Sequence, residues 1–156
     1  MRIAVGADHA GFALKELIAR DLEVKGHVVI DKGTFSEEPV DYPDFAEAVA
    51  RSVASAEAER GVLVCGSGVG ASVAANKVRG VRAAICHDIY SAHQGVEHDD
   101  MNVLALGSRV IGADVAIELV RAFVAATFSG EERHLRRLNK VRAMEARLVE
   151  EESVNG

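Results

Sequence analysis

The sequence is poor in aromatic residues and lacks the features that mark several large classes of protein. Its 156 residues include no tryptophan, two tyrosines, five phenylalanines, two cysteines and two prolines. Two cysteines without a pairing pattern do not predict a disulfide-stapled fold and favour a reducing, cytoplasmic location. No uncharged apolar stretch approaches the roughly 20 residues of a membrane span. Met1 leads directly into a predicted strand rather than a secretory leader, so we expect a cytoplasmic protein that makes no membrane contact.

A surplus of positive charge is also absent. The chain has 18 Lys and Arg against 24 Asp and Glu, a net charge of −6, which argues against a nucleic-acid partner. Apolar residues make up 49% of the chain, enough to form a buried core and too many for a disordered tail. We therefore expect one folded domain over residues 1–156, with a frayed acidic tail at about 150–156.

Short apolar runs alternate with longer segments of helical periodicity. The runs cover residues 2–6, 27–31, 62–65, 82–86 and 103–106. Helices are expected at about 11–25, 43–58, 69–78, 89–97, 113–127 and 131–150. The apolar runs are continuous rather than alternating, which is typical of parallel strands covered on both faces. The pattern predicts a three-layer α/β fold built on a doubly wound, Rossmann-like parallel sheet of about five strands.

The loop after the third predicted strand reads Cys65-Gly66-Ser67-Gly68-Val69-Gly70. Loops at the carboxyl ends of such strands hold ligands, and glycines with free helix N–H groups let the backbone approach an anion. A thiol that faces these N–H groups favours the thiolate, which makes Cys65 a candidate base or nucleophile. Three alternatives remain. The loop could be a turn that binds no ligand, or the Cys65 thiol could be a core side chain, the role that we expect for Cys86. The loop could also bind a dinucleotide, with Asp88 as the acidic residue that follows this motif about 20 positions later.

A polar hinge, residues 97–102, contains His98 followed by Asp99. A histidine there could move a proton near neutral pH, and the alternative is a solvated loop. His87, His93 and His98 are separated by six and five residues, which puts them on no common helix face. We therefore expect no metal site.

Positive charge is concentrated in the last predicted helix. Arg133 and Arg137 lie four residues apart, so both project from one face and could clamp a phosphate dianion. The alternative is a solvated helix with salt bridges to Glu145 and to residues 150–152. Leu138, with Val141 and Leu148, forms a narrow apolar stripe suited to docking on a partner subunit.

An ordered set of short motifs runs along the chain. It consists of Gly6-x-Asp8-His9-x-Gly11-Phe12, Asp31-x-Gly33-Thr34, Asp41-Tyr42-Pro43, the loop of residues 65–70, Ala74-Ala75-Asn76-Lys77, Gly80-Val81-Arg82-Ala83, His98-x-x-x-Asn102-Val103-Leu104, Gly107-x-Arg109-Val110-x-Gly112 and Arg133-His134-x-x-Arg137. Taken together, these motifs resemble the type B ribose-5-phosphate isomerases, a family that also contains the LacA- and LacB-type sugar-phosphate isomerases. The resemblance runs from Ile3 to about Leu138 and disfavours the dinucleotide interpretation.

The resemblance implies an aldose–ketose isomerisation of ribose 5-phosphate and ribulose 5-phosphate, a step of the pentose phosphate pathway, through a cis-enediolate and without metal or organic cofactor. Cys65 would move the proton between C1 and C2, Ser67 and the loop N–H groups would stabilise the enediolate, and His98 would open the sugar ring. A homodimer or dimer of dimers with shared sites is implied. The substrate-binding set would be Asp8, His9, Tyr42, Gly66, Ser67, Gly68, Val69, Gly70, Asp99, Arg109, Arg133 and Arg137.

Three positions depart from the usual family pattern. Asp99 stands where an Asn is common, and an ionised Asp can only accept hydrogen bonds. Ser67 replaces a Thr, and Glu131-Glu132 replaces a Gly-Gly pair. The Asp99 change raises a second hypothesis, the same chemistry on a phosphohexose or phosphotetrose. A third hypothesis is a non-enzymatic nucleotide- or phosphate-binding module that uses the loop of residues 66–70.

Overall fold

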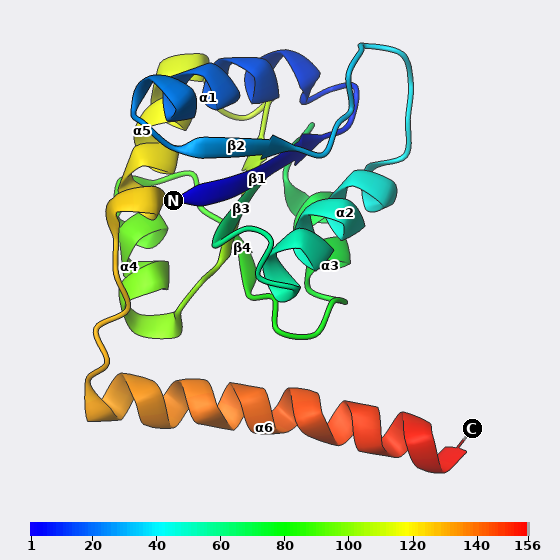
Figure 1. Cartoon of the computed structure of the whole chain (residues 1–156), viewed down its shortest axis with the longest axis vertical. Helices are drawn as coiled ribbons and strands as arrows, with labels where there is room; N and C mark the ends of the chain where they lie inside the picture. Colours follow the sequence, from blue (N-terminus) through cyan, green and yellow to red (C-terminus); the bar gives the residue numbers. More distant parts are fainter. Residues whose placement is uncertain (156) are drawn as a thin grey trace.

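Strands and helices alternate along the chain in the computed structural model, which describes residues 1–155 (Figure 1). The strands are β1 (Arg2–Ala7), β2 (Val28–Asp31), β3 (Arg60–Cys65), β4 (Ala83–Ile85) and β5 (Val103–Gly107). The helices are α1 (Phe12–Val24), α2 (Tyr42–Ala54), α3 (Val69–Ala75), α4 (Ile89–Asp99), α5 (Ala113–Ala125) and α6 (Glu132–Asn155). The strands pair in parallel in the order β2-β1-β3-β5-β4. The predicted doubly wound α/β sheet is confirmed.

Two hydrophobic clusters cover the two faces of the sheet. Helices α1, α4 and α5 pack on one face, and α2 and α3 pack on the other (Figure 1). Successive residues of one strand enter opposite clusters, as Ile3 and Ala4 do in β1, and both are fully buried. Both faces of the inner strands β1, β3 and β5 are buried, so neither face needs polar residues, which explains their continuous apolar runs. The edge strands β2 and β4 are only partly buried or exposed.

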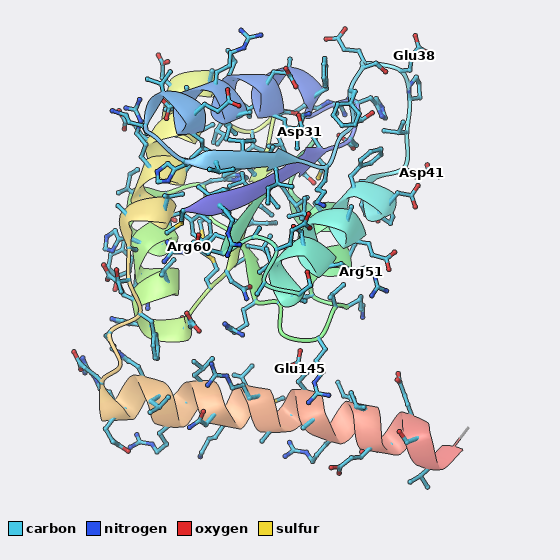
Figure 2. All side chains as sticks on the ribbon, in the orientation of Figure 1. Asp31, Glu38, Asp41, Arg51, Arg60 and Glu145 are labelled. Atoms are coloured by element: carbon cyan, nitrogen blue, oxygen red, sulfur yellow. The ribbon has the colours of Figure 1, made fainter. Side chains whose placement is uncertain are left out.

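Helix α6 lies apart from these layers, along the bottom of the molecule as drawn in Figure 1. Its contacts with the rest of the chain include Leu138, which is 3% exposed, and Glu145, whose carboxylate accepts the Gly80 N–H at 2.8 Å. Figure 2 shows Glu145 on the side of α6 that faces the other layers. The helix continues to Asn155, so the expected frayed tail is helical in its described part, and Gly156 lies outside the described residues. Three consecutive glutamates, good helix formers, extend the helix past residue 150.

Two helices end earlier than their periodicity predicts. Helix α2 ends at Ala54, and Ala56 takes a left-handed conformation with φ of 61°. Helix α3 ends at Ala75 because the Asn76 side chain pairs with the backbone of Ala83 in β4, at 2.9 and 2.8 Å. None of the helices within residues 1–155 combines the length and apolarity needed to cross a membrane.

Candidate functional site

The chain topology opens a crevice between neighbouring strands β1 and β3, because α1 leaves β1 on one face and α3 leaves β3 on the other. The loop after β1 is held against β3. The Asp8 N–H donates to the Val64 carbonyl at 3.3 Å, and the Asp8 carboxylate accepts the Gly11 N–H at 3.0 Å. A Cβ at Gly11 would lie 2.3 Å from the Val64 carbonyl oxygen, so only glycine permits this approach.

Cys65 ends β3 and is 5% exposed. The N–H of Gly68, the N-cap residue of α3, donates to the Cys65 Sγ at 3.1 Å. Gly68 has a φ of +84°, a left-handed conformation that favours glycine. The exposed Ser67 hydroxyl accepts the Val69 N–H at 3.2 Å. The sulfur therefore faces the first N–H group of the helix, the arrangement that the glycine loop predicted.

The second cysteine lies in a different environment. Cys86 belongs to the core cluster beneath α4 and α5, with its sulfur 3.9 Å from the Met101 sulfur. Burial, with a smaller contribution from the negative charge of Asp88, raises the pKa of the Cys86 thiol to about 11. The predicted core role of Cys86 is confirmed.

Three further predicted residues lie around the same edge of the sheet. The Tyr42 ring is so close to Gly70 that a Cβ there would lie 2.6 Å from the ring's Cζ. The Arg109 side chain approaches Gly66, where a Cβ would lie 3.5 Å from its Nη1, and the Arg109 N–H donates to the Gly66 carbonyl at 3.0 Å. The His9 Nδ1 accepts the Val40 N–H at 3.2 Å. We call Asp8, His9, Tyr42, residues 65–70 and Arg109 the cysteine cluster.

A second group, the histidine cluster, joins the last turn of α4 to the first turns of α6. It consists of His98, Asp99, Arg133, His134 and Arg137. The His98 ring stacks on the His134 ring, with centroids 4.0 Å apart and planes 24° from parallel. Burial, followed by the nearby charge of His98, lowers the pKa of His134 below its ordinary value. The His134 ring thus lies as a flat, buried surface against the His98 ring.

Two hydrogen bonds hold the stacked rings. Gln94 Nε2 lies 2.8 Å from His98 Nδ1, and Ser129 Oγ lies 2.6 Å from His134 Nδ1. Neither Gln94 nor Ser129 belongs to a motif that the sequence makes evident. For Gln94 the available signal is its spacing of four residues from His98 on one helix, which places the two side chains on one face.

The cations of α6 have two interpretations, as a phosphate clamp or as members of salt bridges, and each interpretation fits some of them. Arg133 pairs with Glu131 and Arg136 pairs with Glu132, both at 3.0 Å, as the salt-bridge alternative expects but with different acidic partners. Arg137 is exposed and has no hydrogen bond or ion pair within residues 1–155. Its guanidinium is therefore available to an external anion.

The two clusters lie at opposite edges of the sheet. Cys65 is paired with Gly107 at the carboxyl end of β5, whereas His98 lies just before Val103 at the amino end of that strand. Four strand residues cover about 13 Å, and the stretch of α4 from Ile89 to His98 covers about 14 Å. Proton transfer requires heavy atoms about 3 Å apart. One chain therefore does not bring Cys65 and His98 to the same small molecule.

The remaining candidates have structural roles in this fold. Asp88 caps α4 by accepting the Ser91 N–H at 2.7 Å. The acidic residue of the dinucleotide motif therefore has a structural role as a helix cap. His87 accepts the Gly107 N–H at 2.9 Å, and His93 lies 3.1 Å from Glu97. Within residues 1–155, no three His, Cys, Asp or Glu side chains are grouped as metal ligands.

A surface hollow of about 580 Å³ lies beside α2, away from Cys65, and is lined in part by Lys32, Arg51 and Glu57. Lys32 pairs with Glu57 at 2.9 Å and Arg51 with Glu47 at 2.6 Å. With these cations neutralised by carboxylates, we assign the site to the crevice around Cys65 rather than to this hollow.

Comparison with known proteins gives a consistent result. The sequence model of the Ribose/Galactose Isomerase family matches residues 3–141. Ribose-5-phosphate isomerase B of Escherichia coli (strain K12) is 48% identical over 94% of this chain and 97% of its own. D-erythrulose-4-phosphate isomerase of Pectobacterium atrosepticum is 42% identical over 83% of this chain and 86% of its own. The structure of Clostridium thermocellum ribose-5-phosphate isomerase B superimposes with a TM-score of 0.92 and 47% identity over 95% of this chain and 99% of that one. The chain belongs to the ribose/galactose isomerase family.

Proposed function

We propose that this protein interconverts ribose 5-phosphate and ribulose 5-phosphate through a cis-enediolate. The observation that carries the proposal is the Cys65 sulfur, which ends a buried strand and accepts the first N–H of a glycine-rich helix start. Membership of a family that contains ribose-5-phosphate isomerase B of E. coli supports this substrate.

In the proposed mechanism, Cys65 as thiolate removes the proton from C2 of the open-chain aldose and returns it to C1. The electron pair of the broken C2–H bond forms a double bond between C1 and C2, and the π pair of the C1 carbonyl moves onto its oxygen, where negative charge develops. The N–H groups of residues 66–70 and the Ser67 hydroxyl lie in the adjoining loop and would stabilise that oxygen. A proton moves from the C2 hydroxyl to the C1 oxygen, so the ketose has the same atoms as the aldose.

Ring opening is assigned to His98, which would donate a proton to the ring oxygen as the anomeric hydroxyl loses one. Since one chain holds Cys65 and His98 at opposite edges of the sheet, we infer that a second copy supplies the histidine cluster to each cysteine cluster. Helix α6 supports this arrangement because its apolar side chains Val141, Met144 and Leu148 are exposed. A symmetric dimer would cover them.

Phosphate recognition is assigned to His9 and Arg109 from one copy and to Arg133 and Arg137 from the other. Arginine guanidinium groups suit the planar oxygen pairs of a phosphate dianion. Asp8 would accept hydrogen bonds from sugar hydroxyls, and Tyr42 and Asp99 would line the sugar site.

The relative that acts on D-erythrulose 4-phosphate, together with Asp99, keeps a four-carbon substrate as the second candidate. A coupled assay with four-, five- and six-carbon phosphosugars, with and without EDTA, tests the choice. We expect the highest kcat/KM for ribose 5-phosphate, and a higher value for another sugar would refute the assignment. Cys65→Ala should abolish turnover, whereas a simple phosphate-binding module would tolerate it.

A further inference from the structure

Lys15 of α1 is a cation with no exposed surface. Its ammonium binds both carboxylate oxygens of Asp31 at 2.7 Å and lies 3.1 Å from a Glu16 oxygen. It also lies 5.0 Å from the centre of the Phe35 ring. An apolar side chain of similar volume often stabilises a buried site as well as an ion pair does. The charge therefore points to a task beyond filling the core.

The Asp31 carboxylate links Lys15 to the segment between β2 and α2. One of its oxygens also accepts the Gly33 N–H at 2.9 Å. The next peptide is fixed to β1, because the Thr34 N–H donates to Ala7 and the Ala7 N–H donates to Gly33, both at 2.7 Å. Figure 2 shows Asp31 beneath α1, with Glu38 and Asp41 farther along the same segment. Lys15 thus anchors the amino end of residues 32–41.

The other end of the segment reaches the cysteine cluster. The Val40 N–H donates to the His9 Nδ1 at 3.2 Å. A backbone N–H can only donate, so Nδ1 is the acceptor and the ring proton lies on Nε2. Residues 35–39 between the two anchors are exposed, so the path of the segment depends on its ends. His9 consequently presents an Nε2–H donor, the group that a phosphate oxygen requires.

We propose that Lys15 is a positioning residue for phosphate recognition, acting through Asp31, Phe35 and Val40 to keep His9 as an Nε2–H donor. The proposal rests on the proposed function only in taking the phosphate of the substrate as the ligand of His9. It does not require Lys15, which has no exposed surface, to touch the substrate.

The test replaces Lys15 with methionine, an unbranched side chain that is one heavy atom shorter and has no charge. Inorganic phosphate is titrated into the full-length protein by calorimetry, and kcat and KM are measured for ribose 5-phosphate. We expect the phosphate Kd and the KM to rise about tenfold each, while kcat stays within about twofold of the wild-type value. The reason is that the phosphate contact is weakened equally in the ground state and in the transition state. Lys25→Met, at an exposed position just beyond α1, is the matched control and should change neither constant.

A double-mutant cycle shows whether Lys15 acts through His9. In a His9→Ala background, Lys15→Met should weaken phosphate binding by less than about twofold. A lower melting temperature with unchanged Kd and KM would mean that Lys15 is merely structural and would overturn the proposal, as would full additivity in the cycle. If Lys15→Met does not fold, Val40→Pro, which removes the N–H donor to His9 and fixes φ at residue 40, should produce the same tenfold loss. An unchanged Kd in Val40→Pro would refute the connection.

Spectroscopy gives a direct readout of the His9 ring. In protein labelled with ¹⁵N-histidine, His9 should show an unprotonated Nδ1 and a protonated Nε2, and Lys15→Met should mix the two tautomers. A wild-type protein that binds phosphate but turns over no phosphosugar would refute the proposed function and leave the phosphate test of Lys15 intact.

Discussion

Two inactive variants should regain activity when they form one mixed dimer. Cys65→Ala removes the proposed base and His98→Ala removes the proposed ring-opening acid. In one chain these groups are separated by about 13 Å of strand β5. In a two-fold dimer, each site would take Cys65 from one copy and His98 from the other. A mixed dimer then has one site with both substitutions and one site with neither.

The expected recovery follows from counting sites. General acid–base groups contribute about 10²- to 10⁴-fold, so each variant alone should keep on the order of 1% of wild-type turnover or less. Co-expression with two different tags and purification on both isolates the mixed dimer, which should show about half of the wild-type kcat because one of its two sites is intact. Random re-association of equal amounts should give about one quarter. The assay is initial-rate conversion of ribose 5-phosphate.

The control pairs Cys65→Ala with the double variant that lacks both groups. That mixed dimer has no complete site, so its activity should stay at the level of Cys65→Ala alone. If the doubly purified dimer of the two single variants also stays at that level, Cys65 and His98 do not meet across an interface. The division of the site between two copies would then be refuted.

Three further predictions concern stability. Gly11→Ala places a Cβ 2.3 Å from the Val64 carbonyl and should cost about 1–3 kcal/mol, seen as a melting temperature lower by about 2–12 °C. Gly112→Ala, whose Cβ meets open space, should cost less, and equal losses would contradict the packing argument. Because the pKa of Cys86 is raised from 9.0 to about 11, the unfolded chain loses this proton first. The stability it contributes is full below pH 9 and is lost as the pH rises to 11, by up to about 3 kcal/mol. Urea unfolding of Cys86→Ala should lack this part of the decline. Arg60→Met leaves carbonyls at the carboxyl end of α5 without their donor and should cost about 1–3 kcal/mol in thermal unfolding.

Much of the fold followed from local patterns. Continuous apolar runs predicted buried parallel strands, and β1 and β5 are buried on both faces. The glycines after Cys65 predicted a strand–helix turn whose N–H groups face the thiol, and the hydrogen bond from the Gly68 N–H to the Cys65 sulfur bears this out. Helix ends were less predictable. Helix α3 ends where the Asn76 side chain binds the backbone of β4, a strand that follows later in the chain. Helical periodicity does not predict such a contact.

By itself, the sequence determined the fold class, the edge of the sheet that carries the cysteine loop, and the concentration of cations in the last helix. These features depend on residues close together in the chain, whose spacing sets the buried face of each element and the loop at each strand's carboxyl end. Only the tertiary structure separated Cys65 from His98, stacked His98 on His134 and buried the charge of Lys15. Those arrangements depend on which elements pack together across the whole chain, and local periodicity has no information about such contacts.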